Sequence, residues 1–275
     1  MSSGYGDSNR MERMEQGVEL IAVAAPEQCE QLARVLADVW GLYESSAVAS
    51  ADTLVAMARS GCYVTGVLVD GRMIGGGFGW PHHVGAPSGG EWRLHSHVIG
   101  FLDGFRALGL GARIKQHQRE FVRASGMDAV EWTYDPLHAA NARFNLAKLG
   151  ARVLSFHHDY YGTLDDAFSG GLGSDRFLVR WGLDDEPPEA HEPVLGAPPR
   201  ERILAVGTDG APVVTTTAAT VVCAELPVNI VNIRKRDPAL AAEWRDAFAI
   251  TVGREVSAGA RVVGIGPELA YEIRR

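Results

Sequence analysis

The sequence predicts an α/β protein built on a mixed sheet and followed by a small α/β extension. Three observations carry this prediction. Apolar runs typical of strands alternate with segments of helical periodicity over residues 18–183. A proline-rich, acidic stretch, DDEPPEAHEPVLGAPPRE, then interrupts the alternation, which starts again near residue 201. We therefore expect a first domain at 17–184, a linker at 185–200 and a subdomain at 201–275 that packs on the first domain, because so short a segment makes a small core.

The first elements are predicted from apolar periodicity. Val18–Ala24 is an apolar run typical of a strand, and apolar residues at helical spacing follow Pro26. A second, short helix is expected over Asp52–Arg59, with Gly61 just past its end. The runs CYVTGVLVD and RMIGGGFGW are joined by Asp70-Gly71, which favours a hairpin because both residues tolerate positive φ.

The later elements continue the alternation. RLHSHVIGF alternates like a strand, and RALGLGARIKQHQREFVRASG predicts a glycine-containing turn followed by a helix that ends at Gly126. MDAVEWTYDP predicts a strand that ends at Pro136, and HAANARFNLAKLG predicts a short helix that ends at Gly150. Two more strand-like runs, ARVLSFHHDYYG and DRFLVRWGL, complete the order β-α-α-β-β-β-α-β-α-β-β. In the extension, ATVVCAEL, ARVVGI and LAYEIRR indicate strands, and a long helix is expected from Asp237.

Composition and charge narrow the class of protein. Hydrophobic residues make up 46% of the chain and charged residues 22%, as in ordinary globular domains. The formal net charge of −8 disfavours a nucleic-acid backbone or an anionic membrane as a partner. The three cysteines are odd in number and widely spaced, so we expect reduced thiols in a cytoplasmic protein and no metal site. No segment resembles a signal peptide or a membrane span, and residues 1–16 are expected to be a mobile lead-in.

The most informative segment is FRALGLGARI, in which a strand leads into a glycine-containing loop and then into a helix. Glycines let a backbone approach a ligand closely, and a new helix adds unpaired N–H donors and a partial positive charge. We expect a diphosphate to bind here. Lys115 and Arg119 could add charge toward it, although a solvated basic helix face is the commoner reason for such a pair. A dinucleotide fold and a P-loop are disfavoured, because the glycines follow several strands and Ala112-Arg113 replaces Lys-Ser/Thr.

This segment resembles the Arg/Gln-x-x-Gly-x-Gly/Ala signature of the GNAT superfamily of CoA-dependent N-acyltransferases, with Arg106, Gly109 and Gly111 in the signature places. The runs LHSHVIGF, EWTYDPLHAANARFNLAKLGA, YYG and SDRFLVRW are similar to a bacterial and archaeal subgroup with a C-terminal extension. The resemblance implies that pantetheine pairs with the strand and that the pyrophosphate binds the loop amides. The residues it implies for CoA are Ile99, Gly100, Phe101, Arg106, Leu108, Gly109, Leu110, Gly111, Ala112 and Asn141.

Amine acylation needs a base that takes a proton from the amine. His95 and His97 lie on one face of the strand that carries a general base in many members of the family, and an imidazole with a pKa near 6.5 could act directly or through a water. Each could equally be a hydrogen-bonded polar residue on a face of the sheet, with no catalytic role. Metal binding by the pair is less favoured, although His82, His83 or the 157–159 run could supply a third ligand in space. If neither histidine is the base, Glu91, Glu131, Asp135 or a bound water remain.

The departing thiolate needs an acid, and many family members carry a tyrosine for this in the helix after the fifth strand. Leu146 occupies that position here. Tyr134 and Tyr160, or Tyr161, are the replacements to consider, and water could also protonate the thiolate. Aromatic residues on a strand such as Tyr134 are more often part of a core.

The resemblance implies transfer of an acetyl or succinyl group from acyl-CoA to the amine of a small molecule, such as an amino acid or a derived metabolite, in a ternary complex. Two alternatives stay open. The donor could be a carrier protein or an aminoacyl-tRNA, although the acidic balance disfavours tRNA; the basic spots IRKRD, around Arg234–Arg236, and Arg274-Arg275 are expected at solvated ends. The chain could also be an inactive CoA-binding module, as the leucine at position 146 in place of the family tyrosine suggests. An acyl-CoA is the expected co-substrate, with no metal, and a homodimer is the default.

Overall fold

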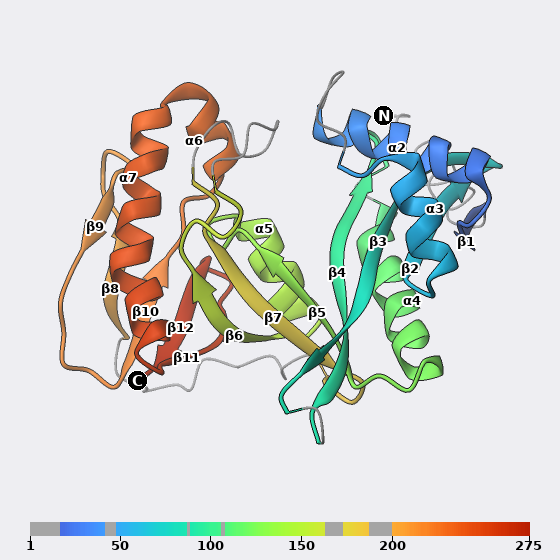
Figure 1. Ribbon diagram of the computed structural model, residues 1–275. Helices are drawn as coiled ribbons and strands as arrows, with labels where there is room; N and C mark the ends of the chain where they lie inside the picture. The colour runs from blue at the N-terminus through green and yellow to red at the C-terminus, as the bar shows by residue number, and fades with distance from the viewer. Residues whose placement is uncertain (1–16, 42–47, 87–88, 106–107, 163–172, 187–199) are drawn as a thin grey trace, which may run out of the picture. The chain divides into compact units, whose positions relative to one another are not determined.

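The computed structural model describes residues 17–41, 48–86, 89–105, 108–162, 173–186 and 200–275 (Figure 1). The predicted lead-in at 1–16 lies outside these residues, as does most of the predicted linker. The chain forms two compact units, residues 1–130 and 131–275, and each is described by itself. Residues 131–186 thus group with the segment predicted as the extension.

The first unit contains an antiparallel arrangement of four strands with helices on both faces. Its strands are neighbours in chain order: β1 (Val18–Ala22), β2 (Tyr63–Val69), β3 (Arg72–Val84) and β4 (Glu91–Phe101). Its helices are α2 (Pro26–Trp40), α3 (Ala51–Arg59) and α4 (Leu110–Ala124). The predicted hairpin between β2 and β3 is confirmed, since Asp70 and Gly71 both have positive φ, 50° and 76°.

Two apolar clusters lie on opposite faces of these strands. Helices α2 and α3 bury Leu32, Leu36 and Leu54 against one face, together with Phe78 and Val98 of the strands. Helix α4 covers the other face, where its buried side chains pack on residues of β1, β2 and β3: Leu110, Ile114, Val18, Val67 and Ile74. The apolar residues that recur at helical spacing in the sequence therefore form the face that each helix buries.

A β-bulge interrupts the pairing of β3 with β4. Phe78 pairs with Val98 while Gly79 pairs with Ser96, so His97 is an extra residue on β4. A bulge of this kind changes the direction in which the neighbouring side chains point. It lies in the part of β4 where the candidate histidines occur.

The second unit contains two groups of strands. The first has the order β5-β7-β6, with β5 (Ala129–Tyr134) starting at the unit boundary, β6 (Arg152–His157) and β7 (Arg176–Gly182). Between β5 and β6 the chain forms α5 (Ala139–Ala142) and a π-helical turn, η2 (Arg143–Lys148). The second group is a five-stranded sheet in the order β11-β12-β10-β8-β9, mixed because β8 runs parallel to β10. Its strands are β8 (Glu201–Val206), β9 (Pro212–Val214), β10 (Val221–Glu225), β11 (Arg261–Ile265) and β12 (Ala270–Arg274).

The helices of the extension are α6 (Ile230–Arg236), α7 (Pro238–Phe248), a π-helical turn η3 (Ala249–Gly253) and α8 (Arg254–Ser257). Figure 1 shows α7 beside the strands of the five-stranded sheet, and the Trp244 indole donates to the Gly210 carbonyl at 3.0 Å. The aromatic rings of Phe177 on β7 and Phe248 on α7 have centroids 5.7 Å apart. The extension thus shares a core with β5–β7 inside the second unit.

The predicted order of elements over residues 18–183 is confirmed. In the extension, the predicted strands at β10, β11 and β12 are present, and the predicted long helix is the continuous run α7-η3-α8. Strands β8 and β9 and helix α6 were not predicted. None of the helices in the described part of the chain has the length and apolar character needed to cross a bilayer.

Candidate functional site

The loop before α4 presents open backbone donors. Helix α4 starts at Leu110, directly after Gly109, whose φ is 68° and which gives no side-chain cap. The amides of Ala112 and Arg113 donate to the Gly109 carbonyl at 3.0 and 3.4 Å, whereas no acceptor among the described residues takes the amides of Leu110 and Gly111. The first turn carries no acidic residue. This helix N-terminus therefore suits an anion.

The side chains of this loop explain its composition. Leu108 and Leu110 are buried against α4 and β3, so only their backbones face outward. A Cβ at Gly109 would meet nothing within 4 Å, so the positive φ, and not crowding, requires glycine there. The predicted Arg106 lies outside the described residues.

The end of β4 carries the residues predicted for pantetheine. Ile99, Gly100 and Phe101 pair on one side with three consecutive glycines of β3. A Cβ at Gly100 would lie 2.3 Å from a ring carbon of Trp40, so this glycine lets α2 pack closely on the strand. Pairing of a ligand with this strand stays a prediction.

The two candidate histidines lie together around one indole. The ring centroids of His95 and His97 are both 4.9 Å from that of Trp80, and 5.8 Å from each other. One ring nitrogen of His82 lies within 4.8 Å of one of His95, a separation at which two imidazoles could bind the same cation. The bulge at His97 brings these rings to one place on the sheet.

Burial makes both imidazoles weaker bases than the sequence suggested. Burial, with the nearby His97, His82 and Lys115, lowers the pKa of His95 to about 4. Burial also lowers the pKa of His97. The expected value near 6.5 is wrong for His95, because removal from water penalises the charged imidazolium. His95 is therefore uncharged at neutral pH.

Lys115 does not lie on a solvent-exposed face of α4, as the sequence predicted. Its side chain is buried beneath β4, and its Nζ donates to Ser96 Oγ at 3.1 Å. Gln118 Nε2 donates to the same oxygen at 2.9 Å. Burial holds the pKa of Lys115 well below its usual value. Both the phosphate contact and the solvated face expected for Lys115 are therefore wrong.

The tyrosines considered as acids lie in different surroundings. The Tyr134 hydroxyl is buried and 3.3 Å from that of Tyr271, which donates to the Pro136 carbonyl at 2.7 Å. Burial raises the pKa of Tyr134, so its phenol is a poor proton donor. Tyr160 is 41% exposed and lies against the ring of His157. Of the two, Tyr160 is the one whose ring reaches solvent.

The helix after β5 differs from a regular α-helix. Leu146, at the position of the family tyrosine, is buried in the π-helical turn η2. Beside it, Asn145 Oδ1 accepts a hydrogen bond from the Trp132 indole at 3.2 Å. Asn141, predicted to touch CoA, is exposed in α5, and its backbone N–H donates to His138 Nδ1 at 3.3 Å.

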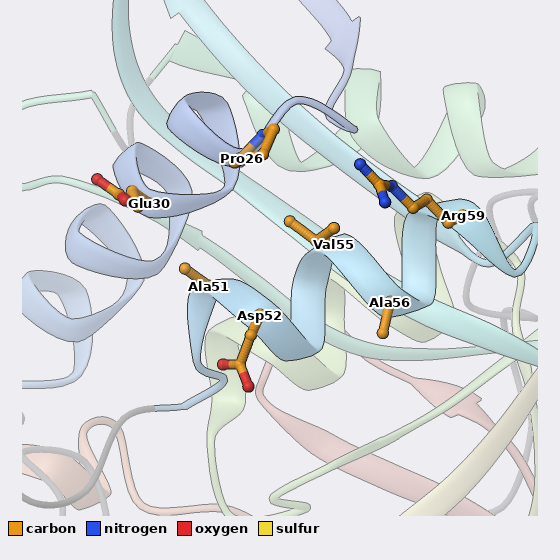
Figure 2. Close-up of a pocket in the computed structure, with 7 residues that line it drawn as sticks. All are labelled: Pro26, Glu30, Ala51, Asp52, Val55, Ala56 and Arg59. Carbon is orange, nitrogen blue, oxygen red and sulfur yellow. The ribbon is translucent and has the colours of Figure 1, made fainter.

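A separate pocket of about 600 Å³ lies between α2 and α3 (Figure 2). Its walls include Glu30 and Asp52, and none of the residues predicted for CoA or catalysis lines it. Glu30 is paired with Arg34 at 3.3 Å on the exposed side of α2. The candidate site is therefore the β4–α4 segment with the histidines, and not this groove.

No family model matches the chain, and no curated protein matches it either. Solved structures of acetyltransferases are similar to it. A GNAT-family acetyltransferase from Streptococcus pneumoniae is 12% identical, with a TM-score of 0.45 over 59% of this chain and 98% of that one. The ribosomal-protein-S18-alanine N-acetyltransferase from Escherichia coli is 12% identical, with a TM-score of 0.45 over 64% of this chain and 99% of that one.

The ribosomal-protein-S5-alanine acetyltransferase from Vibrio fischeri is 14% identical, with a TM-score of 0.47 over 62% of this chain and 96% of that one. Similarities at this level give no information on the acyl group or the amine. In fold, 59–64% of the chain is similar to these acetyltransferases.

Proposed function

We propose that this chain is an acyl-CoA-dependent N-acyltransferase that transfers an acetyl or succinyl group to the amine of a small molecule. The observation that carries the proposal is the junction of β4 and α4. A left-handed glycine there starts a helix, and no acceptor among the described residues takes the amides of Leu110 and Gly111, which would suit an anion. Neutral imidazoles lie earlier on the same strand.

The donor would use backbone groups of the first unit. The CoA diphosphate would accept hydrogen bonds from the amides at the start of α4, and the pantetheine amides would pair with residues 99–101 of β4. Because these contacts are made by the backbone, changes to the histidines should leave donor affinity nearly unchanged.

The transfer itself would proceed by direct attack of the amine. The amine nitrogen forms a bond to the thioester carbon, the C–S bond breaks, and CoA leaves as a thiolate. His95, uncharged at neutral pH, would take the proton that the nitrogen loses, directly or through a water. Tyr160 or water would return a proton to the thiolate, since the buried Tyr134 hydroxyl is bound to Tyr271.

Isothermal titration with CoA, acetyl-CoA and succinyl-CoA tests the donor site, and release of free thiol on adding single amines tests the transfer. Gly109→Glu should weaken CoA binding at least about 100-fold, since it places a carboxylate where the diphosphate would lie. Gly126→Glu is a matched control: Gly126 has a φ of 67°, also has nothing within 4 Å of a Cβ, and ends the same helix. Equal binding by the two variants would contradict the proposed site.

A further inference from the structure

Two helices of the extension bring guanidinium groups to one carboxylate at the end of β5. Asp135 Oδ2 accepts from Arg245 Nη2 at 2.8 Å and from Arg234 Nη2 at 3.5 Å. Its other oxygen accepts from the Leu137 amide at 3.0 Å. Each arginine side chain is only 7% exposed. One carboxylate thus faces two buried groups that keep their positive charge in proteins.

Arg245 has more donors than these contacts use. Its Nε and Nη1 atoms are buried and have no hydrogen-bond partner within the described ranges of the chain. Buried donors almost always have an acceptor, and leaving a charged one unsatisfied is unfavourable. Within the described residues these donors of Arg245 have no acceptor, which is the observation that a bound ligand would explain.

The neighbouring charges support an anion at this place. Burial raises the pKa of Asp135, but Arg245 and then Arg176 outweigh this effect and keep it below its usual value. Two further carboxylates lie nearby. Asp175 Oδ1 accepts from the Asp159 amide at 3.0 Å and lies 2.9 Å from His158, whereas its Oδ2 is buried with no hydrogen-bond partner among the described residues. Asp159 accepts from the Ser174 amide at 3.0 Å. Asp135 itself is paired with Arg234 and Arg245 and lies in the field of Arg176, so it faces more than one guanidinium group.

The cluster also extends toward the surface. The Arg176 guanidinium lies over the ring of Tyr161 at 5.4 Å, and Tyr161 is 37% exposed. Gly173 is half-buried beside the Arg245 stem, where a Cβ would be 3.9 Å from Arg245 Cδ.

We infer that Arg176, Arg234 and Arg245, gathered around Asp135, form a binding site for the carboxylate group of a small metabolite. A planar monoanion fits the planar donor geometry of a guanidinium, and it adds one negative charge where Asp135 alone faces several positive ones. The second unit would thereby bind a carboxylate by itself, a property that goes beyond the proposed acyl transfer.

Binding can be measured without any acyl-CoA. Succinate should bind the full-length protein saturably in isothermal titration and raise its Tm, whereas neutral succinamide and inorganic phosphate should bind at least ten-fold more weakly. Arg245→Gln should lower succinate affinity at least ten-fold. Arg261→Gln is the matched control, because Arg261 is an exposed arginine on β11 of the same extension, and it should leave the affinity unchanged.

Asp135→Asn gives a second, opposite test, measured on protein that circular dichroism shows to be folded, because this variant is also expected to lose stability. Removal of the internal carboxylate should tighten succinate binding about ten-fold, an effect that a purely structural role does not produce. No saturable binding by the wild type, equal affinity in Arg245→Gln, unchanged or weaker binding in Asp135→Asn, or phosphate binding as tight as succinate would each overturn the inference.

Succinate binding by the second unit is measured separately from acyl transfer. Loss of saturable succinate binding with intact transfer would overturn this inference alone, and an absence of transfer with intact succinate binding would refute the proposed function alone.

Discussion

Each unit contains a buried cluster of basic side chains, and the two clusters differ in their state of charge. In the first unit, burial lowers the pKa values of His95, His97 and Lys115. In the second unit, Arg234 and Arg245 remain guanidinium ions and are directed at Asp135. Imidazoles and amines can release a proton when they leave water, whereas a guanidinium cannot and needs a counter-ion.

This difference separates two chemical tasks. The imidazoles of the first unit are uncharged and can therefore accept a proton, but burial makes them weaker bases than a free imidazole. The arginines of the second unit hold fixed positive charge, which suits recognition of an anion. Similar burial of basic residues therefore has different consequences, decided by the type of side chain and by the carboxylate that faces it.

The largest expected effect concerns the proton acceptor of the first cluster. His95→Ala should lower kcat/KM by about 10²–10⁴ with CoA affinity nearly unchanged, because general-base catalysis contributes that much. In the wild type, kcat/KM plotted against pH should have an acid limb due to His95. This limb should lie near pH 4, where the imidazole titrates, and not near pH 6–7. Full activity in both His95→Ala and His97→Ala, measured with a saturating donor, would move the search for a base to Glu91, Glu131 or a bound water, since Asp135 is the counter-ion of Arg234 and Arg245.

The second cluster is expected to be the more sensitive in stability. Asp135→Asn removes the counter-ion of two buried guanidinium groups and should lower the free energy of unfolding by about 3–5 kcal/mol. Denaturant titration measures the change. As a control, Asp209→Asn alters a carboxylate in the turn before β9 that accepts the Ala211 amide at 3.0 Å, and it should change stability far less. A loss for Asp135→Asn no larger than this control would contradict the contrast between the clusters.

Acid should destabilise the first unit through its histidines. His95 has a pKa of about 4 in the folded chain and about 6.5 when unfolded. The unfolded state therefore takes up a proton between these pH values that the folded state does not, so stability falls as pH falls through this window. The full loss is on the order of 3 kcal/mol. His95→Gln should remove that part of the decrease between pH 7 and pH 4 in denaturant titrations; an unchanged decrease would exclude His95 as its source.

The smallest effect is expected at Lys115. Lys115→Met keeps most of the volume of the side chain and leaves Gln118 as donor to Ser96, so stability should change by only about 1 kcal/mol. CoA affinity should stay the same, because the amine points under β4 and not toward the loop. A large loss of CoA affinity in a folded Lys115→Met protein would restore the phosphate contact first expected from the sequence.

Much of the fold was predictable because its signals are local. The apolar spacing of α2 and α4 and the Asp70-Gly71 turn each specify structure within a few residues. Strand β9 has only three residues, and β8 begins with Glu201 and Arg202, so neither gives an apolar run of useful length. The π-helical turns η2 and η3 continue helices whose sequence periodicity is that of an ordinary α-helix, so nothing distinguishes them in advance.

The candidate site was predictable only in part. The glycine loop could be located because φ and chain order are local properties, whereas the pKa of His95 depends on the burial of its ring. Arg245 and Arg234 are 110 and 99 residues from Asp135 in sequence, and no local pattern joins them. The expectation that IRKRD is a solvated end is wrong for Arg234, which is buried.

The contact between Tyr134 and Tyr271 has a consequence for synthesis of the chain on the ribosome. The two phenols are 137 positions apart, and Tyr271 lies on β12, which pairs with both β10 and β11. Tyr134 on β5 therefore lacks this buried partner until residue 271 has left the exit tunnel, long after the first unit can have folded. Phe177 packs against both tyrosines, so this aromatic cluster is incomplete until residue 271 emerges, and a pause in translation after residue 177 should leave the nascent second unit more prone to aggregation and chaperone binding.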